Sequence, residues 1–174
     1  RCGLPIKKFI AAVNVNSGVP EFLNGGKPSF VQDFGGRRKT IMTYSSAMDV
    51  GKPSNWARIM DLYGGDRRAI KKDFEATSVS EKETTQTIAD IYKKYGYIAD
   101  PHTAVGIAAA MTCHSTPSVV LATAHPAKFK EIVESAVGKK IPLPVRLSAI
   151  VRKLKKSVLI NKDYGELRKL LISR

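Results

Sequence analysis

The chain has 174 residues, of which 43% are hydrophobic, and this is enough apolar material for one domain with a real core. Composition argues against three classes of protein. No run approaches the roughly 18 consecutive apolar residues of a membrane span. No signal-peptide pattern follows Arg1. Two cysteines are too few for a disulfide scaffold, and they fit a reducing cytoplasm.

The net charge of +14 suggests a nucleic acid or an acidic lipid as partner. However, the 29 Lys and Arg residues are scattered along the chain, and no aromatic residues alternate with them as a base-stacking platform would need. The densest basic run, residues 152–156, falls on an amphipathic pattern of Leu147, Ile150, Val151 and Leu154. We therefore expect this run to lie on a solvated helix face.

Residues 1–8 are typical of a helix end that leads into a strand, and the chain has no initiator Met, so this start predicts a fragment of a longer protein. Residues 8–15 predict a buried strand that ends near Asn14 and Asn16. Side-chain amides at a strand end can present hydrogen bonds to a ligand, or they can bond their own backbone at a turn. Both interpretations stay open. Residues 20–23 predict a helical turn.

Residues 32–39 predict a surface loop with glycines beside arginines. Such a loop could cradle a phosphate, but it matches neither a Walker loop nor a dinucleotide fingerprint. A short β-rich run at residues 40–44 precedes Ser45, Ser46 and Asp49. Two serines and an acid resemble a catalytic cluster. Because no histidine lies nearby in sequence and no Gly-x-Ser-x-Gly elbow is present, serine hydrolysis is unsupported.

The next segments predict three scaffold helices, each with its own start or stop signal. They are residues 53–63, which open with a Pro-Ser-Asn cap, residues 66–76, which begin at Asp66, and residues 80–96, which run from a capping box to Gly96.

An Asp-Pro pair at residues 100–101 starts a fourth helix, with a carboxylate at the cap and Pro at the first position. Residues 104–111 are almost entirely small or apolar, which predicts a helix that is buried all round and packed closely on a sheet. His102 lies in the first turn of this helix. It is either a structural hydrogen-bonding residue or a catalyst.

Residues 119–122 form an apolar run of strand length, which predicts a central strand buried on both faces of a parallel sheet. Thr123 and His125 stand where this strand ends, and Pro126 opens a helix that Gly138 closes. Turns of this kind line ligand crevices at the carboxyl ends of strands in open α/β sheets. The turn at Thr123 is therefore the predicted ligand site.

The tail predicts a basic helix, a short apolar run at residues 158–160 and a last helix at residues 163–172. Three predicted strands alternate with helices, which indicates an α/β fold with three α/β/α layers and a mostly parallel sheet. We expect the early and central strands to share that sheet. A zinc site is not predicted, because paired ligand spacing is absent among the candidate ligands His102, Cys113, His114 and His125.

Several longer motifs occur together in the chain: Gly3-Leu4-Pro5-Ile6, Asn14-Val15-Asn16, Ala47-Met48-Asp49-Val50, Pro53-Ser54-Asn55-Trp56, Thr84-Thr85-Gln86-Thr87, Asp100-Pro101-His102-Thr103-Ala104-Val105 and Ala122-Thr123-Ala124-His125-Pro126-Ala127-Lys128-Phe129. In this order and rough spacing they resemble threonine synthase, a pyridoxal-phosphate enzyme of fold type II. The resemblance covers nearly the whole chain but only the C-terminal portion of such an enzyme. It implies that residues 1–174 form the C-terminal part of the catalytic large domain, incomplete without the preceding half.

The resemblance implies a lyase of threonine biosynthesis in the cytoplasm, which converts O-phospho-L-homoserine and water into L-threonine and phosphate. Its cofactor, pyridoxal phosphate, is held as a Schiff base on a lysine. Thr123 matches the family threonine whose hydroxyl bonds the pyridine nitrogen. The family's lysine and its Gly-Asn-Phe-Gly phosphate loop would lie before Arg1, since neither motif occurs in this chain. We therefore predict Thr123 as a cofactor-binding residue and no catalytic residue, and we expect the chain alone to be inactive.

The predicted partners are the phosphohomoserine substrate and the N-terminal portion of the same enzyme, with no nucleic acid and no membrane. Two other functions stay open. The chain could be a non-catalytic relic of the same fold, or a basic nucleic-acid-binding domain that only its charge favours. The roles of His125, Asn14, Asn16 and Ser46 are not assigned by the resemblance.

Overall fold

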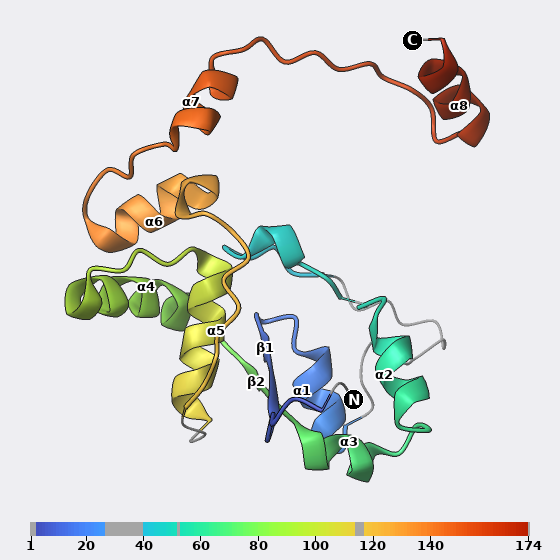
Figure 1. Ribbon diagram of the computed structural model, residues 1–174, viewed down its shortest axis with the longest axis vertical. Coiled ribbons are helices and arrows are strands. Elements are labelled where there is room, and N and C mark those ends of the chain that lie inside the picture. Colours follow the sequence, from blue (N-terminus) through green and yellow to red (C-terminus); the bar gives the residue numbers. More distant parts are fainter. Residues whose placement is uncertain (1–2, 27–39, 52, 114–116, 174) are drawn as a thin grey trace. The chain divides into compact units, whose positions relative to one another are not determined.

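The computed structural model describes residues 3–26, 40–51, 53–113 and 117–173, and the chain divides into two compact units, Arg1–Pro142 and Leu143–Arg174. The elements in chain order are β1 (Phe9–Val13), α1 (Gly18–Leu23), η1 (Ser46–Met48), α2 (Trp56–Leu62), α3 (Arg67–Asp73), β2 (Phe74–Ser78), α4 (Glu81–Tyr95), α5 (Pro101–Thr112), η2 (Pro126–Phe129), α6 (Lys130–Val137), α7 (Val145–Val151) and α8 (Tyr164–Ile172) (Figure 1). The predicted 32–39 loop, Cys2 and His114 lie outside the described residues.

The first unit is built around a parallel pair of strands, β1 and β2, in which Phe9 lies opposite Phe74 and Val13 opposite Ser78. Because side chains alternate along a strand, the sheet has two faces. Ile10 and Ala12 pack on one face with residues of α5. The other face packs Phe74 and Ala76 against a core of α1, α2 and α3, made by Phe22, Leu23, Trp56 and Ile70.

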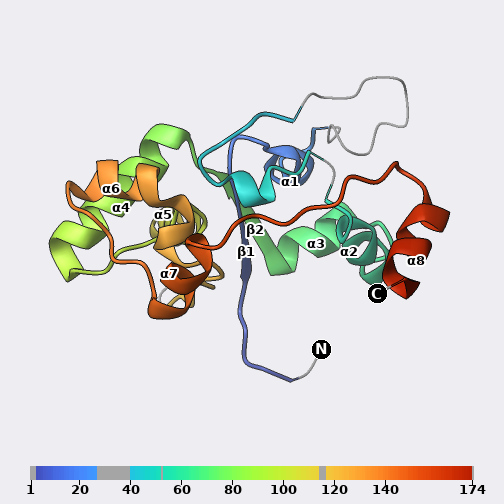
Figure 2. The same cartoon turned by 90° about the horizontal axis from the view of Figure 1, so that it is seen from above.

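The sheet therefore lies between α5 on one face and α1 with its neighbours on the other (Figures 1 and 2). This arrangement of helix, parallel sheet and helix is the three-layer α/β architecture that the sequence predicted, and the fold class is confirmed. The carboxyl ends of both strands point to one edge of the unit. The first turn of α5 begins at the same edge, as the chain passes from β2 through α4 into α5 (Figure 1).

The sequence analysis missed β2 and extended the preceding helix to about Ala76, whereas α3 ends at Asp73. The reason is tertiary packing. The Phe74 ring stacks on Phe9 with a centroid separation of 5.2 Å, and it meets Tyr63 edge-on at 6.1 Å. Pairing with β1 and these ring contacts outweigh the local helical pattern, as is common for short segments.

The predicted strand at residues 40–44 is also wrong, because its backbone bonds to side chains and not to a neighbouring strand. The N–H and the carbonyl of Ile41 bond the side chain of Asn16, and the N–H of Thr43 donates to Asp49. Side-chain bonds of this kind compete directly with a β ladder.

The central strand predicted at residues 119–122 does not form either, so the expectation that it shares a sheet with the early strand is wrong for this chain. Val119 is 91% exposed and Leu121 is 79% exposed. A buried parallel strand needs neighbours on both sides, and the sheet in the described residues consists of β1 and β2. The run is held instead on one side by α5, where a Cβ added to Gly106 would meet Val120 at 2.8 Å.

The helix caps and helix ends predicted from the sequence were more reliable than the predicted strands. Ser80 and Glu83 form the predicted reciprocal capping box, and Gly96 ends α4 with φ +68°. Asp100 caps α5, with Pro101 in its first turn. The helix predicted from Pro126 begins as the 3-10 turn η2, continues as α6 and ends at Gly138. These helices share one core, made by Ile88, Ala99, Ala104, Phe129, Val133 and Ile141.

The second unit contains α7 and α8. Its predicted last helix is confirmed, with Asp163 as the cap of α8. The basic helix is shorter than expected: α7 ends at Val151, so the basic run at residues 152–156 lies beyond the helix and not on its face. Leu154 and Leu159 are 93% and 100% exposed, so this unit has no apolar core of its own among the described residues.

Candidate functional site

Polar side chains gather at the carboxyl edge of the sheet, and Asn14 lies at their centre. This residue follows β1 directly and is buried. Its Nδ2 lies 3.0 Å from Thr43 Oγ1, 2.9 Å from Ser45 Oγ and 3.1 Å from Asp49 Oδ1, so two amide hydrogens are shared among three acceptors. Its Oδ1 accepts from the backbone and side-chain nitrogens of Asn16.

Asp49 binds Thr43 through both of its carboxylate oxygens. Its Oδ2 accepts from the Thr43 N–H at 2.9 Å, and its Oδ1 accepts from the Thr43 hydroxyl at 2.6 Å. We call Asn14, Asn16, Thr43, Ser45 and Asp49 the Asn14–Asp49 network. It fastens the loop before η1 to the end of β1, and almost every polar atom in it is occupied by another.

The network shows which group lies between the serine and the acid of the cluster seen in the sequence. Ser45 and Asp49 do come together, but the group between them is the Asn14 amide and not an imidazole. An amide cannot remove a proton from a serine. Ser46 is exposed at the start of η1 and lies outside the network. The bonds of Ser45 and Asp49 therefore serve the protein's own structure.

Sequence reasoning named Asn14 and Asp49 separately but did not join them, and it missed Thr43 altogether. No local signal could have done so, because 35 residues separate Asn14 from Asp49. The bonds of Asn14 also answer the question left open at the strand end: its amide serves the protein itself.

Thr123 lies on the segment that returns along α5 toward the same edge. Its side chain is exposed, and within the described residues its hydroxyl makes no hydrogen bond. His125, two residues on, is the N-cap of η2, where its Nδ1 accepts from the Ala127 N–H at 3.1 Å. The turn is anchored by Ala127 and Phe129, which are buried. We call residues 123–129 the Thr123 turn.

His102 connects α5 to the Thr123 turn. Its ring packs on Phe129 with centroids 5.1 Å apart. Its Nε2 is buried and has no hydrogen-bond partner among the described residues. Burial lowers the pKa of His102; Asp100 opposes this shift, Lys128 adds to it and Asp49 opposes it. Burial therefore favours the neutral form of this imidazole.

Asp100 fixes the start of α5 beside His102. Its carboxylate accepts from the His102 N–H at 2.9 Å, from the Thr103 N–H and from the Thr103 hydroxyl. A buried carboxylate with this many donors is fully satisfied, and it caps the positive end of the helix. Asp100 thus fixes the first turn of α5, which carries His102.

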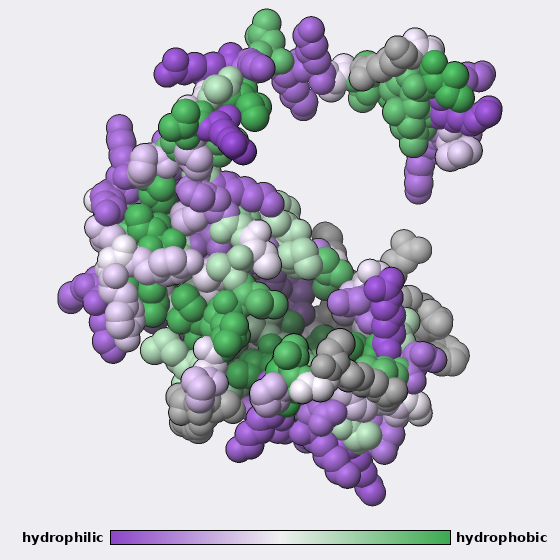
Figure 3. All heavy atoms as spheres, in the orientation of Figure 1, coloured by the Kyte–Doolittle hydropathy of each residue, from purple (hydrophilic) through white to green (hydrophobic). Residues whose placement is uncertain are grey.

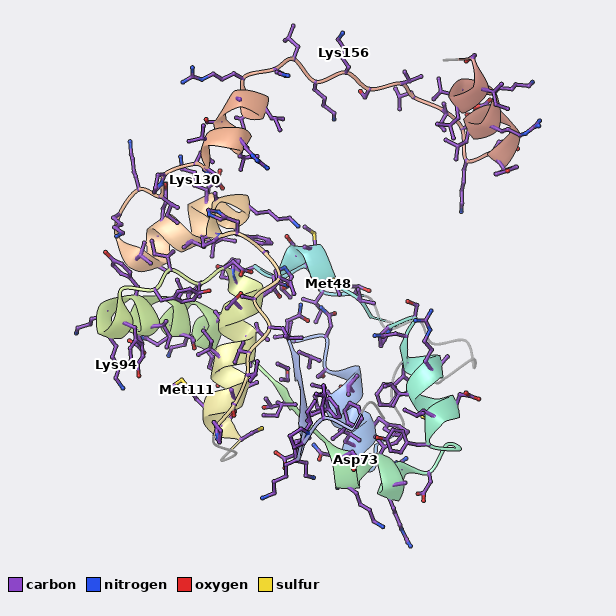
Figure 4. All side chains as sticks on the ribbon, viewed as in Figure 1. Met48, Asp73, Lys94, Met111, Lys130 and Lys156 are labelled. Atoms are coloured by element: carbon purple, nitrogen blue, oxygen red, sulfur yellow. The ribbon has the colours of Figure 1, made fainter. Side chains whose placement is uncertain are left out.

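The same edge carries an exposed methionine. Met48 of η1 lies at the end of the unit where α5 begins, and Met111 lies toward the other end of that helix (Figure 4). Residues on η1, the first turn of α5 and the Thr123 turn therefore share one side of the first unit. This edge is where the sequence analysis placed the ligand site.

Other chemistry finds no support in the described residues. Burial raises the pKa of the Cys113 thiol, and its bond to Glu75 raises it further, which is the opposite of an activated nucleophile. No three His, Cys, Asp or Glu side chains of the described ranges gather as metal ligands do. In the same ranges, no helix has both the length and the apolar character that crossing a bilayer requires.

Comparison with known proteins gives one consistent answer. The family model "Threonine synthase, C-terminal" matches residues 103–171. The threonine synthase of Escherichia coli is 39% identical over 176 residues, which cover 98% of this chain and 38% of that enzyme. The threonine synthase of Serratia marcescens is 37% identical, with the same shares covered. The chain thus spans about 38% of the length of these relatives.

Solved structures agree. The crystal structure of the Escherichia coli enzyme matches with a TM-score of 0.79 and 38% identity, over 98% of this chain and 38% of that one. A PLP-bound threonine synthase from Brucella melitensis matches with a TM-score of 0.80 and 28% identity, over 97% of this chain and 40% of that one. The resemblance predicted from the sequence is thus confirmed: over almost its whole length, this chain resembles the C-terminal portion of the threonine synthases.

Proposed function

We propose that this chain acts as the C-terminal portion of a pyridoxal-phosphate-dependent threonine synthase. In that enzyme, O-phospho-L-homoserine and water become L-threonine and phosphate. The observation that carries the proposal is the extent of the similarity, which covers 98% of the chain in sequence and in fold and leads to threonine synthases each time. The chain supplies one wall of the active site, and the lysine that carries the cofactor in this family belongs to the part of the enzyme that precedes this segment.

Thr123 is the residue proposed to hold the cofactor, and its environment fits that role. The hydroxyls of Thr43 and Thr103, at the same edge, are engaged within the chain. The Thr123 hydroxyl is exposed and makes no such bond among the described residues. It lies at the start of a turn that His125 caps and that packs through Phe129 on the His102 ring. A polar heterocycle can therefore reach it without breaking an internal bond.

When bound, pyridoxal phosphate acts as the electron sink for the reaction. The contribution of Thr123 is to bond the pyridine nitrogen. A hydroxyl can donate to an unprotonated nitrogen or accept from a protonated one, whereas a carboxylate would enforce protonation. Thr123 therefore orients the ring without fixing the charge on its nitrogen.

The Asn14–Asp49 network supports this site from the side. It holds the loop of residues 40–50 against the end of β1 through bonds between 2.6 and 3.1 Å. We propose that its role is to give the wall a fixed shape, because its polar atoms bond one another and leave little capacity for a ligand. On this proposal residues 1–174 form part of one catalytic domain in a cytoplasmic enzyme, and they contribute no catalytic residue of their own.

A hybrid enzyme tests the function. The segment of the Escherichia coli enzyme that aligns with this chain is replaced by residues 1–174, and the hybrid is expressed in a strain that lacks threonine synthase. We expect growth without threonine, and threonine formation from phosphohomoserine by the purified hybrid. The matched control is the same hybrid with Thr123→Val.

The two rival functions give different outcomes. A folded hybrid that binds no pyridoxal phosphate and forms no threonine would favour a non-catalytic relic. Retention of the chain on heparin or DNA with a steep salt dependence would favour a nucleic-acid-binding domain. The latter is not favoured, because the basic residues are scattered along the chain. Hydrophilic and hydrophobic side chains are intermingled on the face shown in Figure 3.

A further inference from the structure

Two imidazoles make contacts at the Thr123 turn, one within the turn and one from α5. The first belongs to His125. Its Nδ1 accepts from the Ala127 N–H at 3.1 Å and thereby caps η2. A nitrogen accepts a hydrogen bond only while it carries no proton.

The second imidazole belongs to His102, which lies on a different element. Its ring packs on Phe129 at the end of the turn, and its Nε2 is buried without a partner in the described part of the chain. A neutral ring tolerates this apolar contact. A charged ring would bring a desolvated N–H into a place without an acceptor, which costs free energy.

The charged groups that face His102 do not give its buried Nε2 a hydrogen-bond acceptor. Asp100, on its own helix, already accepts three bonds from His102 N–H and Thr103. Asp49, on the loop before η1, is engaged by Asn14 and Thr43. Lys128, on the turn itself, is a cation and repels a second positive charge.

We propose that His102 and His125 are positioning residues for Thr123: the His102 ring holds the turn on α5 through Phe129, the His125 Nδ1 caps η2 within the turn, and protonation of His102 loosens the turn. The role in catalysis rests on the proposed function, because it takes Thr123 as the cofactor-binding residue. The positioning itself depends only on the two contacts, one to the Ala127 N–H and one to the Phe129 ring.

The sign of the pH effect follows from burial. Because the pKa of His102 is lower in the folded chain than in the unfolded one, acid protonates the unfolded chain first. The stabilising contribution is complete above the ordinary histidine range near pH 6.5, and it is lost as the pH falls below that range toward the lowered value. We therefore expect the turn to loosen on mild acidification.

Amide hydrogen exchange on the full chain tests this positioning without any cofactor. We measure the protection of the Ala127 N–H at pH 7.5 and 5.5, corrected for the intrinsic exchange rate, against a buried amide of α4 such as Ile88. We expect protection at Ala127 to fall by about tenfold at the lower pH. The Ile88 amide should change much less.

Two substitutions keep the contacts but cannot be protonated. His102→Phe preserves a ring against Phe129 and removes the buried nitrogen. His125→Asn preserves a side-chain acceptor at a helix cap. In His102→Phe and in the double variant, we expect protection at Ala127 to become independent of pH over this range. Equal loss of protection in the original chain and the double variant would overturn the proposal.

The hybrid enzyme separates this proposal from the proposed function. Its affinity for pyridoxal phosphate should weaken between pH 7.5 and 5.5, and the double variant should flatten that dependence. If exchange at Ala127 behaves as expected but the hybrid binds no cofactor, the proposed function fails and the positioning role stands. If the exchange does not depend on the two histidines, the positioning role fails whatever the hybrid does.

Discussion

Two regions at the same edge of the first unit use polar side chains in opposite ways. The Asn14–Asp49 network is closed: its amides, hydroxyls and carboxylate bond one another, and Asn14, Thr43 and Ser45 are buried. The Thr123 turn is open. Its anchor residues Ala127 and Phe129 are buried, yet the hydroxyl of Thr123 faces outward and makes no bond to the described residues.

This difference indicates that the network stabilises the fold and that the turn is available to bind a ligand. A polar group that is buried and satisfied stabilises the fold, and its loss leaves its partners unpaired. A polar group that is held in place but not bonded is free to bind something else. Substitutions in the two regions should therefore change different quantities, the free energy of unfolding in the network and ligand affinity in the turn.

The largest effect on stability is expected from Asn14→Leu. The substitution nearly conserves volume but removes the donor to Thr43, Ser45 and Asp49. Each unpaired buried group costs about 1–3 kcal/mol, and partial rearrangement of the loop limits the total to about 3 kcal/mol. Urea unfolding monitored by circular dichroism measures this loss of stability. A change below about 0.5 kcal/mol would mean that the network is not a support.

The next effect concerns catalysis by the hybrid enzyme. In the hybrid enzyme, Thr123→Val should lower kcat/KM by about 10- to 100-fold, which corresponds to about 1.4–2.7 kcal/mol. The free energy of unfolding should change little, because the hydroxyl has no partner within the described chain to lose. Steady-state kinetics and urea unfolding on the same preparations check both parts. Thr123→Ser, which keeps the hydroxyl, is the control.

A smaller effect is expected where α5 meets the segment before Thr123. In Gly106→Ala the new Cβ would meet Val120 Cγ1 at 2.8 Å, closer than side chains allow. The clash costs about 1–3 kcal/mol and offsets the gain of about 1 kcal/mol that alanine brings to a helix interior. Because Val120→Ala removes the opposing methyl, the double variant should be more stable than the two single effects predict. A double-mutant cycle measures this coupling, and strict additivity would contradict the contact.

The smallest effect is expected far from both regions, at the start of α4. Ser80→Ala removes the bond to the Glu83 N–H and should cost about 1 kcal/mol of stability. The bonds from the Ser80 side chain and backbone lower the pKa of Glu83. Their contribution is therefore present above the ordinary glutamate range, near pH 4.3, and is lost as the pH falls through the lowered value. Unfolding curves at neutral pH and at about pH 3 should show a smaller stability difference between the two proteins at the lower pH, where the bond to the Glu83 N–H remains.

Local signals predicted the helices well. The capping box at Ser80 and Glu83, the Asp100–Pro101 start and the glycine ends at Gly96 and Gly138 are contacts within a few residues, and the structure contains each of them. Such motifs satisfy the free backbone groups of a helix end regardless of what surrounds it. This independence from context is why sequence alone was sufficient.

A strand forms only where a partner strand pairs with it, and the strand predictions from the sequence were partly wrong for this reason. Phe74 to Ser78 became a strand because β1 pairs with it, while residues 119–122 look like a buried strand but have no partner strand in the described chain. The site shows the same limit. Thr123 could be nominated from its motif, whereas the link between Asn14 and Asp49 and the contact of His102 with Phe129 join distant residues and had no local signature.

The contrast between the closed network and the open turn is tested most directly by a pair of matched substitutions. Thr43→Val and Thr123→Val remove the same hydroxyl from the two regions of one hybrid enzyme. We expect Thr43→Val to lower the free energy of unfolding by about 2 kcal/mol, because the Thr43 hydroxyl is bonded and buried. It should leave the affinity for pyridoxal phosphate within about twofold. Thr123→Val should do the reverse, weakening that affinity by about tenfold with a stability change below about 0.5 kcal/mol. Equal effects of the two substitutions on both quantities, or an affinity loss confined to Thr43→Val, would contradict the account.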